Sequence, residues 1–275
     1  MKFNELKCGI TGHTGILGRE LLKKNKNLKF VKFKGDITKK SHIKKWLQKN
    51  TIDIIVHLAA VVPTNIVDKK INYANKVNYI GTKLLVDELL KYKKIKWFFY
   101  SSTSHVYKFS KNKISENSQI NPTSKYGLTK LKGENYIKKT LNKKIPYCIG
   151  RIFSFTSVHQ KKPFVIPSII NKAKLRQETV SFDNTNHLRD FLCMDDVCNA
   201  IKALIDRKST GIYNIGSGNK VLISDIVKLI FTKCKKKYLI KDNSKQTCLV
   251  SNNSKIKKLN WKPSKNIKSI IEELF

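Results

Sequence analysis

A glycine-rich turn near the start of the chain constrains the fold of these 275 residues more than any other feature. The apolar run Leu6–Thr11 leads into three glycines spaced by two residues, and a helix-like segment follows from Arg19. After a strand, such glycines allow a tight turn, close approach of a pyrophosphate and close helix–strand packing. The N–H groups and dipole at the helix start favour anions. The pattern predicts a dinucleotide site, with an ordinary structural turn as the alternative. Its candidate cofactor-binding residues are Gly12, His13, Thr14, Gly15, Ile16, Leu17 and Gly18.

The rest of the chain alternates apolar runs with helix-like segments, which is typical of βαβ units and a parallel sheet. Expected strands cover Leu6–Thr11, Leu28–Phe33, Ile52–Leu58, Trp97–Ser101, Ile145–Arg151 and Ile212–Ile215. Expected helices cover Thr123–Leu141, Ile223–Thr232 and the segment around Ala74 to Leu89, where apolar residues recur at helical spacing. We therefore expect an α/β fold, a doubly wound parallel sheet of the Rossmann type with a small C-terminal substrate-binding α/β cap. Residues 1–152 would bind the nucleotide and 153–275 would form mainly the cap, with a strand and helix near 190–216 returning to the first unit.

The chain is strongly basic, with 56 Lys and Arg against 19 Asp and Glu and a net charge of +37. Only five of the basic residues are Arg, and the lysines are spread along the whole sequence. A nucleic-acid surface would favour Arg for bidentate phosphate contacts and would concentrate the charge on one face. Lys, Asn and Ile share A/T-rich codons, so a biased genome explains the composition more simply. We expect no specific nucleic-acid partner.

The six cysteines form no C-x-x-C pair and no zinc-type spacing, so we expect reduced, structural thiols and no metal site. The first seven residues are polar and do not resemble a signal peptide. No stretch approaches the ~20 apolar residues of a membrane-spanning helix. These features favour a soluble, cytoplasmic protein without a membrane partner.

A second motif, Tyr126 and Lys130, follows the serine- and threonine-rich end of a strand, Ser101–Thr103. Residues four apart in a helix share one face, so the phenol and the ammonium can point into one cleft. A phenol with its usual pKa of about 10 is a poor acid–base catalyst at neutral pH. A nearby ammonium stabilises the phenolate and lowers that pKa. Alone, the pair fits a solvated helix face; beside a dinucleotide turn it predicts an acid–base site.

The end of the second expected strand lacks the acidic residue that usually holds a ribose 2′-hydroxyl. It reads Lys32-Phe33-Lys34, and a carboxylate appears only at Asp36. Lysines attract a 2′-phosphate that a carboxylate would repel, so we expect NADP(H) to be preferred, with NAD(H) possible.

Besides these motifs, further short sequence blocks follow one another along nearly the whole chain. They are His57-Leu58-Ala59-Ala60, Val77-Asn78 with Gly81-Thr82, Arg189-Asp190-Phe191 with Asp195-Asp196-Val197, Tyr213 to Gly218, and Leu259 to Pro263. With this set the chain resembles the extended short-chain dehydrogenase/reductase enzymes, in the group of NAD(P)-dependent nucleotide-sugar epimerases, dehydratases and reductases.

The resemblance implies roles for individual residues. Tyr126 would be the catalytic acid–base, Lys130 would tune it and bind the nicotinamide ribose, and Thr103 would hold the reacting sugar oxygen. Other cofactor contacts would come from Asp36, Ile37, Leu58, Ala59, Ala60 and Asn78, and substrate contacts from Thr103, Ser104, His105, Ser154 and Arg189. Arg189 would pair with the diphosphate of the sugar nucleotide, and an ion pair with Asp190 is the alternative.

Departures from the family pattern narrow the expected reaction. Sugar 4,6-dehydratases carry Asp-Glu after the catalytic Thr, whereas this chain has Ser104-His105, so dehydration is not expected. His105 could act as an acid or base, or could simply be a packed residue at the strand end. Ser154 replaces an amide of the family, and the sequence around Arg151, with Gln160 following, resembles 4-keto-sugar reductases of the dTDP-4-dehydrorhamnose type.

We therefore expect an enzyme that reduces the 4-keto group of a nucleotide-diphosphate 6-deoxy sugar. The first alternative is a nucleotide-sugar 4-epimerase that keeps its cofactor. The second is a non-enzymatic nucleotide- or RNA-binding regulator on the same fold, against which the intact Thr103, Tyr126 and Lys130 argue. The resemblance also allows a homodimer paired through the helices that carry Tyr126 and Asn78.

Overall fold

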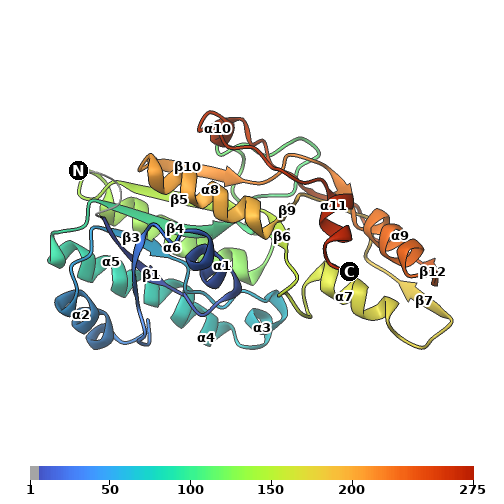
Figure 1. Ribbon diagram of the computed structural model, residues 1–275, viewed down its shortest axis with the longest axis horizontal. Helices are drawn as coiled ribbons and strands as arrows, with labels where there is room; N and C mark the ends of the chain where they lie inside the picture. Colours follow the sequence, from blue (N-terminus) through green and yellow to red (C-terminus); the bar gives the residue numbers. More distant parts are fainter. Residues whose placement is uncertain (1–5) are drawn as a thin grey trace.

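The computed structural model describes residues 6–275 and is organised around a six-stranded parallel sheet in the order β10-β5-β4-β3-β1-β2 (Figure 1). The polar start of the chain, on which the expectation of no signal peptide depends, lies mostly outside the described residues. The strands of this sheet are β1 (Lys7–Thr11), β2 (Lys29–Lys32), β3 (Ile54–His57), β4 (Trp97–Thr103), β5 (Tyr147–Ile152) and β10 (Gly211–Ile215). Strand β1 lies between β3 and β2, and the chain winds outward to both sides of it, so the predicted doubly wound sheet is confirmed.

Both faces of the sheet are buried because successive side chains of a strand point to opposite faces. In β3, Ile54 and Val56 join a core with α1 (Ile16–Lys24) and α8 (Met194–Asp206). Ile55 between them joins the opposite core, under α2 (Lys40–Lys49), α5 (Gly81–Tyr92) and α6 (Lys125–Leu141). All four residues of β3, three apolar ones and His57, are therefore buried, as a central parallel strand requires.

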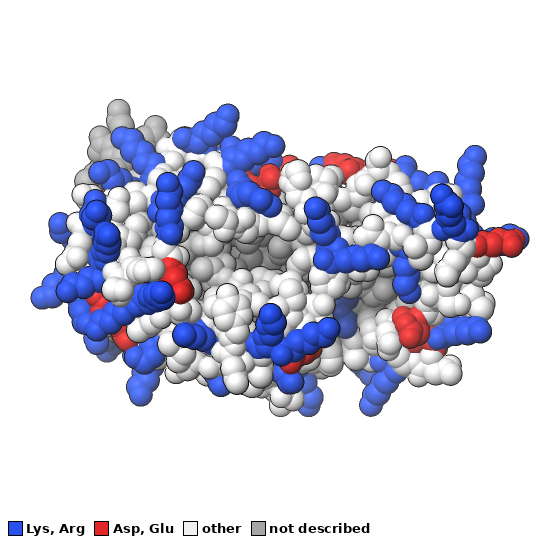
Figure 2. Space-filling model, turned by 90° about the horizontal axis from the view of Figure 1, so that it is seen from below, with Lys and Arg blue, Asp and Glu red and all other residues white. Residues whose placement is uncertain are grey.

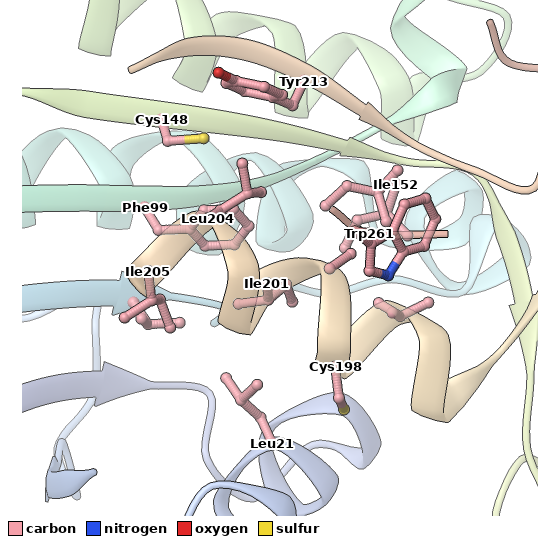
Figure 3. Close-up of a cluster of buried hydrophobic side chains, with 14 of the residues drawn as sticks. Leu21, Phe99, Cys148, Ile152, Cys198, Ile201, Leu204, Ile205, Tyr213 and Trp261 are labelled. Atoms are coloured by element: carbon pink, nitrogen blue, oxygen red, sulfur yellow. The ribbon is translucent and has the colours of Figure 1, made fainter. Parts of the chain in front are cut away.

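The core beneath α8 also gathers distant parts of the sequence (Figure 3). Ile201 and Leu204 of α8 pack towards Phe99 of β4, and Trp261, near the C-terminus, lies against the same cluster. The indole N–H of Trp261 donates to the carbonyl of Asp196 at 3.0 Å. The Lys- and Asn-rich tail is thereby held on the main domain.

The apolar spacing from Ala74 to Leu89 predicts one regular helix, but the structure shows an irregular one. Helices α3 (Thr64–Lys69) and α4 (Ile71–Asn75) are followed by a π-helical turn, Lys76–Ile80, before α5 begins. Asn78, in this turn, is buried and bonds the main chain of Val61. Periodicity could not show this turn, because an extra residue leaves the apolar steps on either side nearly unchanged.

The cap lies at one end of the sheet, on the right in Figure 1. Its elements are β6 (Ser154–Thr156), α7 (Val165–Ala173), β7 (Thr179–Phe182), β8 (His187–Arg189), β9 (Phe191–Cys193), β11 (Val221–Leu222), α9 (Ile223–Lys233), β12 (Lys237–Ile240), β13 (Thr247–Leu249) and α11 (Ile267–Glu272). Helix α10 (Ser254–Lys257) instead packs on β10 of the main sheet. Three small sheets, β11-β8-β13, β12-β7 and β6-β9, were not predicted, because their short strands pair with segments far away in the sequence. Strand β10 pairs with β5 and α8 packs on α1, while the division at residue 152 stays a prediction.

Candidate active site

The glycine turn after β1 is built as the sequence predicts. Gly12 has φ +72°, and a Cβ there would stand 2.5 Å from the backbone nitrogen of Ala59. A Cβ on Gly18 would collide with the carbonyl oxygen of Gly12. The first glycine thus serves the turn and the approach of the segment after β3, and the third serves the packing of α1 on the turn.

The start of α1 offers free donors towards open space. No side chain caps the helix, its first turn carries no acid, and its first backbone bond runs from Arg19 to Gly15. The N–H groups of Ile16, Leu17 and Gly18 consequently have no backbone acceptor in the part of the chain that the structure describes. A Cβ on Gly15 would touch only the Gly12 oxygen, at 3.3 Å. This cradle fits a pyrophosphate.

A cleft of about 710 Å³ runs from this turn to the cap. Its wall contains most of the predicted site residues, namely Gly12, Thr14, Gly15, Ile16, Leu17, Gly18, Leu58, Ala59, Ala60, Thr103, Ser104, His105, Tyr126, Lys130 and Ser154. Figure 2, viewed from the side of α3, α4 and α7, shows the surface hollowed between the sheet and the cap. Lys and Arg side chains are scattered over the whole of this face rather than gathered in one patch. No Asp or Glu lies among the described residues that line the cleft.

Close packing of α6 on the end of β4 brings Tyr126 and Thr103 into the wall of the same cleft. A 3₁₀ turn, Ser104–Val106, follows β4, and a Cβ on Gly127 would collide with the carbonyl oxygen of His105 in that turn. The Ser124 hydroxyl caps α6 by accepting from the N–H of Gly127 at 3.0 Å. The sequence did not identify Gly127 as a site residue. Its position beside Tyr126 was visible, but the close contact with the His105 backbone that requires a glycine there was not.

Tyr126 and Lys130 both lie almost fully inside the protein, at 9% and 1% exposure. Burial raises the pKa of the Tyr126 phenol and lowers the pKa of Lys130 to about 7, although the Glu134 carboxylate works in the opposite sense on Lys130. The ammonium of Lys130 lies 4.0 Å from the ring centre of Tyr100. For Tyr126, burial therefore outweighs the phenolate stabilisation by Lys130 that the sequence predicted.

A buried ion pair between Glu134 and Arg151 lies next to Lys130 and the Ser102–Thr103 strand end, and it was not predicted from the sequence. Glu134 stands one turn beyond Lys130 on α6 and accepts from Arg151 Nε at 3.0 Å and Nη2 at 2.6 Å. The hydroxyl of Ser102, next to Thr103, donates to the same carboxylate at 2.5 Å. Exposures of 0% for Glu134 and 1% for Arg151 show that both groups are buried, and the partly exposed Lys138 adds a longer contact of 3.4 Å to the same carboxylate. The spacing of Glu134 from Lys130 was visible in the sequence; its partner on β5 was not.

Five predicted contact residues lie outside the cleft wall: His13, Asp36, Ile37, Asn78 and Arg189. The Asp36 carboxylate is exposed and accepts from the N–H and hydroxyl of Thr38 at 2.9 and 2.8 Å. The buried side chain of Ile37 packs under Gly81. Asn78 reaches the cleft through the main chain of Val61, from which it accepts at 2.7 Å and to which it donates at 3.0 Å.

Arg189 makes no ion pair with Asp190, the alternative that the sequence left open. It donates to the carbonyls of Leu188 and Thr247 and to the Thr247 hydroxyl. Asp190 instead accepts from the backbone N–H groups of Ser217, Gly218 and Ser251. Burial lowers the pKa of Arg189 to about 10, and no carboxylate among the described residues pairs with it.

His105 lines the cleft, but it is held as a packed residue. Its Nδ1 lies 3.0 Å from the Ser124 hydroxyl, and its ring centre lies 6.1 Å from that of Tyr126. Burial and the charge of Arg189 lower the pKa of His105 to about 4. The imidazole is therefore neutral at pH 7, which favours the packing interpretation over acid–base catalysis.

Residues 6–275 contain no group of three or more His, Cys, Asp or Glu side chains that could hold a metal ion. None of their helices is long and apolar enough to cross a membrane.

Known proteins resemble this chain in sequence and in fold. A putative UDP-glucose 4-epimerase from Methanocaldococcus jannaschii is 31% identical over 186 residues, which cover 65% of this chain and 60% of that protein. A dTDP-D-glucose 4,6-dehydratase from Dictyostelium discoideum is 27% identical over 219 residues, covering 74% and 50%. The chain thus spans only half to three fifths of the length of these relatives. The structure of RMD from Pseudomonas aeruginosa complexed with NADPH superposes with a TM-score of 0.88 at 20% identity, over 98% of this chain and 97% of that one.

The sequence profile of the NAD dependent epimerase/dehydratase family matches residues 8–216, from β1 through the last strand of the main sheet. This stretch holds the glycine turn, the Thr103 strand end and the Tyr126–Lys130 pair, so the family resemblance read from the sequence is confirmed. The chain belongs to the NAD-dependent epimerase/dehydratase family.

Proposed function

We propose that the protein is an NAD(P)-dependent enzyme that reduces the 4-keto group of a nucleotide-diphosphate sugar. The observation that carries this proposal is the shared cleft: a turn fitted to a pyrophosphate and the three residues Thr103, Tyr126 and Lys130 line the same 710 Å³ space. A pure binding protein has no need of a buried phenol and a buried amine at the far end of its nucleotide site. When bound, the nicotinamide cofactor supplies or accepts the hydride.

The protonation states favour the reductive direction. Because burial raises the pKa of Tyr126, its phenol keeps its proton and can donate it to the oxygen on which negative charge develops. Thr103 Oγ1 accepts from the His105 N–H at 3.2 Å, so its own O–H is free to donate to the same oxygen. Two preorganised donors stabilise that charge in the transition state. Lys130, with a pKa of about 7, holds an exchangeable proton one helical turn away and can return it to Tyr126.

Dehydration fits this cleft poorly. Loss of water from the sugar needs an acid and a base besides the tyrosine, and the described cleft wall offers no carboxylate. The position that follows Thr103 carries Ser104 and a neutral His105. This argues against a dehydratase even though one of the relatives carries that name.

A 4-epimerase is the second candidate, favoured by the name of the Methanocaldococcus relative. An epimerase would use the same Thr103, Tyr126 and Lys130, but would keep its cofactor and return the hydride to the other face of the sugar. The difference between the two reactions is therefore the fate of the cofactor.

For the substrate we propose Arg189 as the partner of the diphosphate. Its charge acts on His105 in the cleft wall, and its half-buried guanidinium bonds two carbonyls and a hydroxyl but no carboxylate among the described residues. A guanidinium without an acidic partner is suited to bind a diphosphate. For the cofactor we propose NADPH, because Lys32 and Lys34 are exposed at the end of β2 and Asp36 is engaged with Thr38. A homodimer stays a prediction.

The test is to incubate the purified protein with NADPH and a panel of nucleotide 4-keto sugars, following absorbance at the nicotinamide band and the product by mass spectrometry. A reductase consumes one NADPH for each product formed. Product formation without net consumption identifies an epimerase, and no product from any member of the panel supports the regulator alternative.

A further inference from the structure

Two buried polar atoms of the cleft wall have no hydrogen-bond partner among the residues that the structure describes. Thr156 is 2% exposed and Gln160 is 7% exposed, and both line the cleft from the cap side. The Thr156 hydroxyl oxygen and the Gln160 Oε1 are enclosed and form no hydrogen bond with any described residue. Buried polar groups are normally bonded, because an unmade bond costs free energy. Two such groups in one wall indicate a ligand that completes them.

The backbone aims both residues into the cleft. In β6 the side chain of Phe155 packs against the core under α8, so its neighbour Thr156 points to the opposite face of the strand. The chain then turns, with the N–H of Gln160 donating to Ser157 at 3.0 Å, and returns to the cleft at Gln160.

The position of this turn selects the ligand. His159 lies 3.5 Å from Glu20 of α1, and Phe155 packs on the same core as Ile16 and Leu17. Glu20 is five residues beyond the N-cap Gly15, roughly 7 Å along the helix at 1.5 Å per residue. The cap segment 154–160 therefore lies against the helix whose free N–H groups form the pyrophosphate cradle.

We propose that Thr156 and Gln160 are the cap's contribution to the dinucleotide site, and that they bond the phosphate–ribose part of the bound cofactor. This inference rests on the proposed function, because it assumes a dinucleotide in the cradle. The Gln160 amide offers a donor to a phosphate oxygen and an acceptor for a ribose hydroxyl, and the Thr156 hydroxyl can do either. The cofactor would thus be held from both halves of the molecule.

The experiment compares Thr156→Val and Gln160→Leu, which keep shape and remove the polar atoms, with Gln48→Leu on the exposed face of α2 as the control. NADPH and NADH are titrated by fluorescence without substrate. We expect each cleft variant to bind roughly three- to tenfold more weakly, the range for one hydrogen bond, and the control to match the parent. The affinities for UDP, dTDP and GDP, titrated without cofactor, should change less than twofold.

A second readout excludes a merely structural role. Because the two polar groups are unpaired without ligand, their removal should leave the melting temperature of the free protein unchanged or raise it. Unaltered NADPH and NADH affinities in both variants, or a loss confined to the nucleoside diphosphates, would overturn the assignment. If the parent itself binds neither NADPH nor NADH, the proposed function fails instead, and the two failures remain distinguishable.

Discussion

Glu134 provides the sharpest prediction about stability, because its carboxylate is sealed inside the protein with a charged partner. Glu134→Gln removes the charge and keeps the shape. It leaves the Arg151 guanidinium, 1% exposed, facing a neutral amide where it had two bonds of 3.0 and 2.6 Å to a carboxylate. Removing one partner of a buried pair typically costs about 3–5 kcal/mol, since the other charge stays buried and uncompensated.

That cost should be visible in thermal melts. For a domain of this size about 1 kcal/mol corresponds to roughly 2–4 °C, so we expect the melting temperature to fall by roughly 6–20 °C. Glu178→Gln is the matched control, because Glu178 pairs with Lys237 at 3.1 Å where their side chains are 84% and 75% exposed. An exposed pair contributes about 0–1 kcal/mol. Urea unfolding of the same proteins gives the free-energy differences directly.

A double variant separates the pair from the rest of the fold. Glu134→Gln combined with Arg151→Met removes both charges, and we expect it to be less destabilised than the sum of the two single variants. If Glu134→Gln changed stability no more than Glu178→Gln does, the buried pair would not be a stabilising element. The view that it supports the Ser102–Thr103 strand end would then be wrong.

Three further predictions concern catalysis, pH and cofactor choice. Tyr126→Phe should slow turnover by about 100-fold or more while NADPH titrations stay unchanged, and parent-like rates would remove Tyr126 from its role. Lys130→Met should slow turnover and weaken cofactor binding. Because the folded pKa of Lys130, about 7, lies below its usual 10.5, the buried charge destabilises the fold most below pH 7. This variant should therefore melt above the parent at pH 6, with the gap narrowing by pH 9, and a gap independent of pH would contradict that pKa. The double variant Lys32→Glu/Lys34→Glu should lower the ratio of kcat/KM for NADPH to kcat/KM for NADH by about fivefold to tenfold. A parent protein that already prefers NADH, or a ratio that the variant leaves unchanged, would show that the 2′-phosphate lies elsewhere.

The main sheet was predictable because its information is local. A short, mostly apolar run such as Ile54–His57 and the glycine spacing after β1 each have one common structural meaning, and the structure reproduces both. Strand ends shifted by only one or two residues, as at β4, which runs on to Thr103. The cap was predictable only as a region, because its three-residue strands pair with segments far away in the sequence.

The site was predictable in its residues but less so in its electrostatics. The motif placed Tyr126 and Lys130 on one face, whereas their pKa directions depend on how deeply α6 is buried. The bond partners of Glu134, and the fact that no carboxylate among residues 6–275 pairs with Arg189, depend on pairings between distant strands. That Gln160 Oε1 finds no hydrogen-bond donor in the described part of the chain is likewise a property of the assembled cleft, and no spacing in the sequence encodes it.

The proposed function requires that hydride passes from the nicotinamide to the sugar inside the cleft that Tyr126 lines. The most direct measurement uses NADPH deuterated at C4 of the nicotinamide, in both stereochemical forms, with a nucleotide 4-keto-6-deoxy sugar and detection by mass spectrometry and NMR. We predict that one of the two labelled forms, and not the other, gives a product with one deuterium at sugar C4, and that Tyr126→Phe gives almost none. A protein that forms no deuterated product from either form would contradict the account.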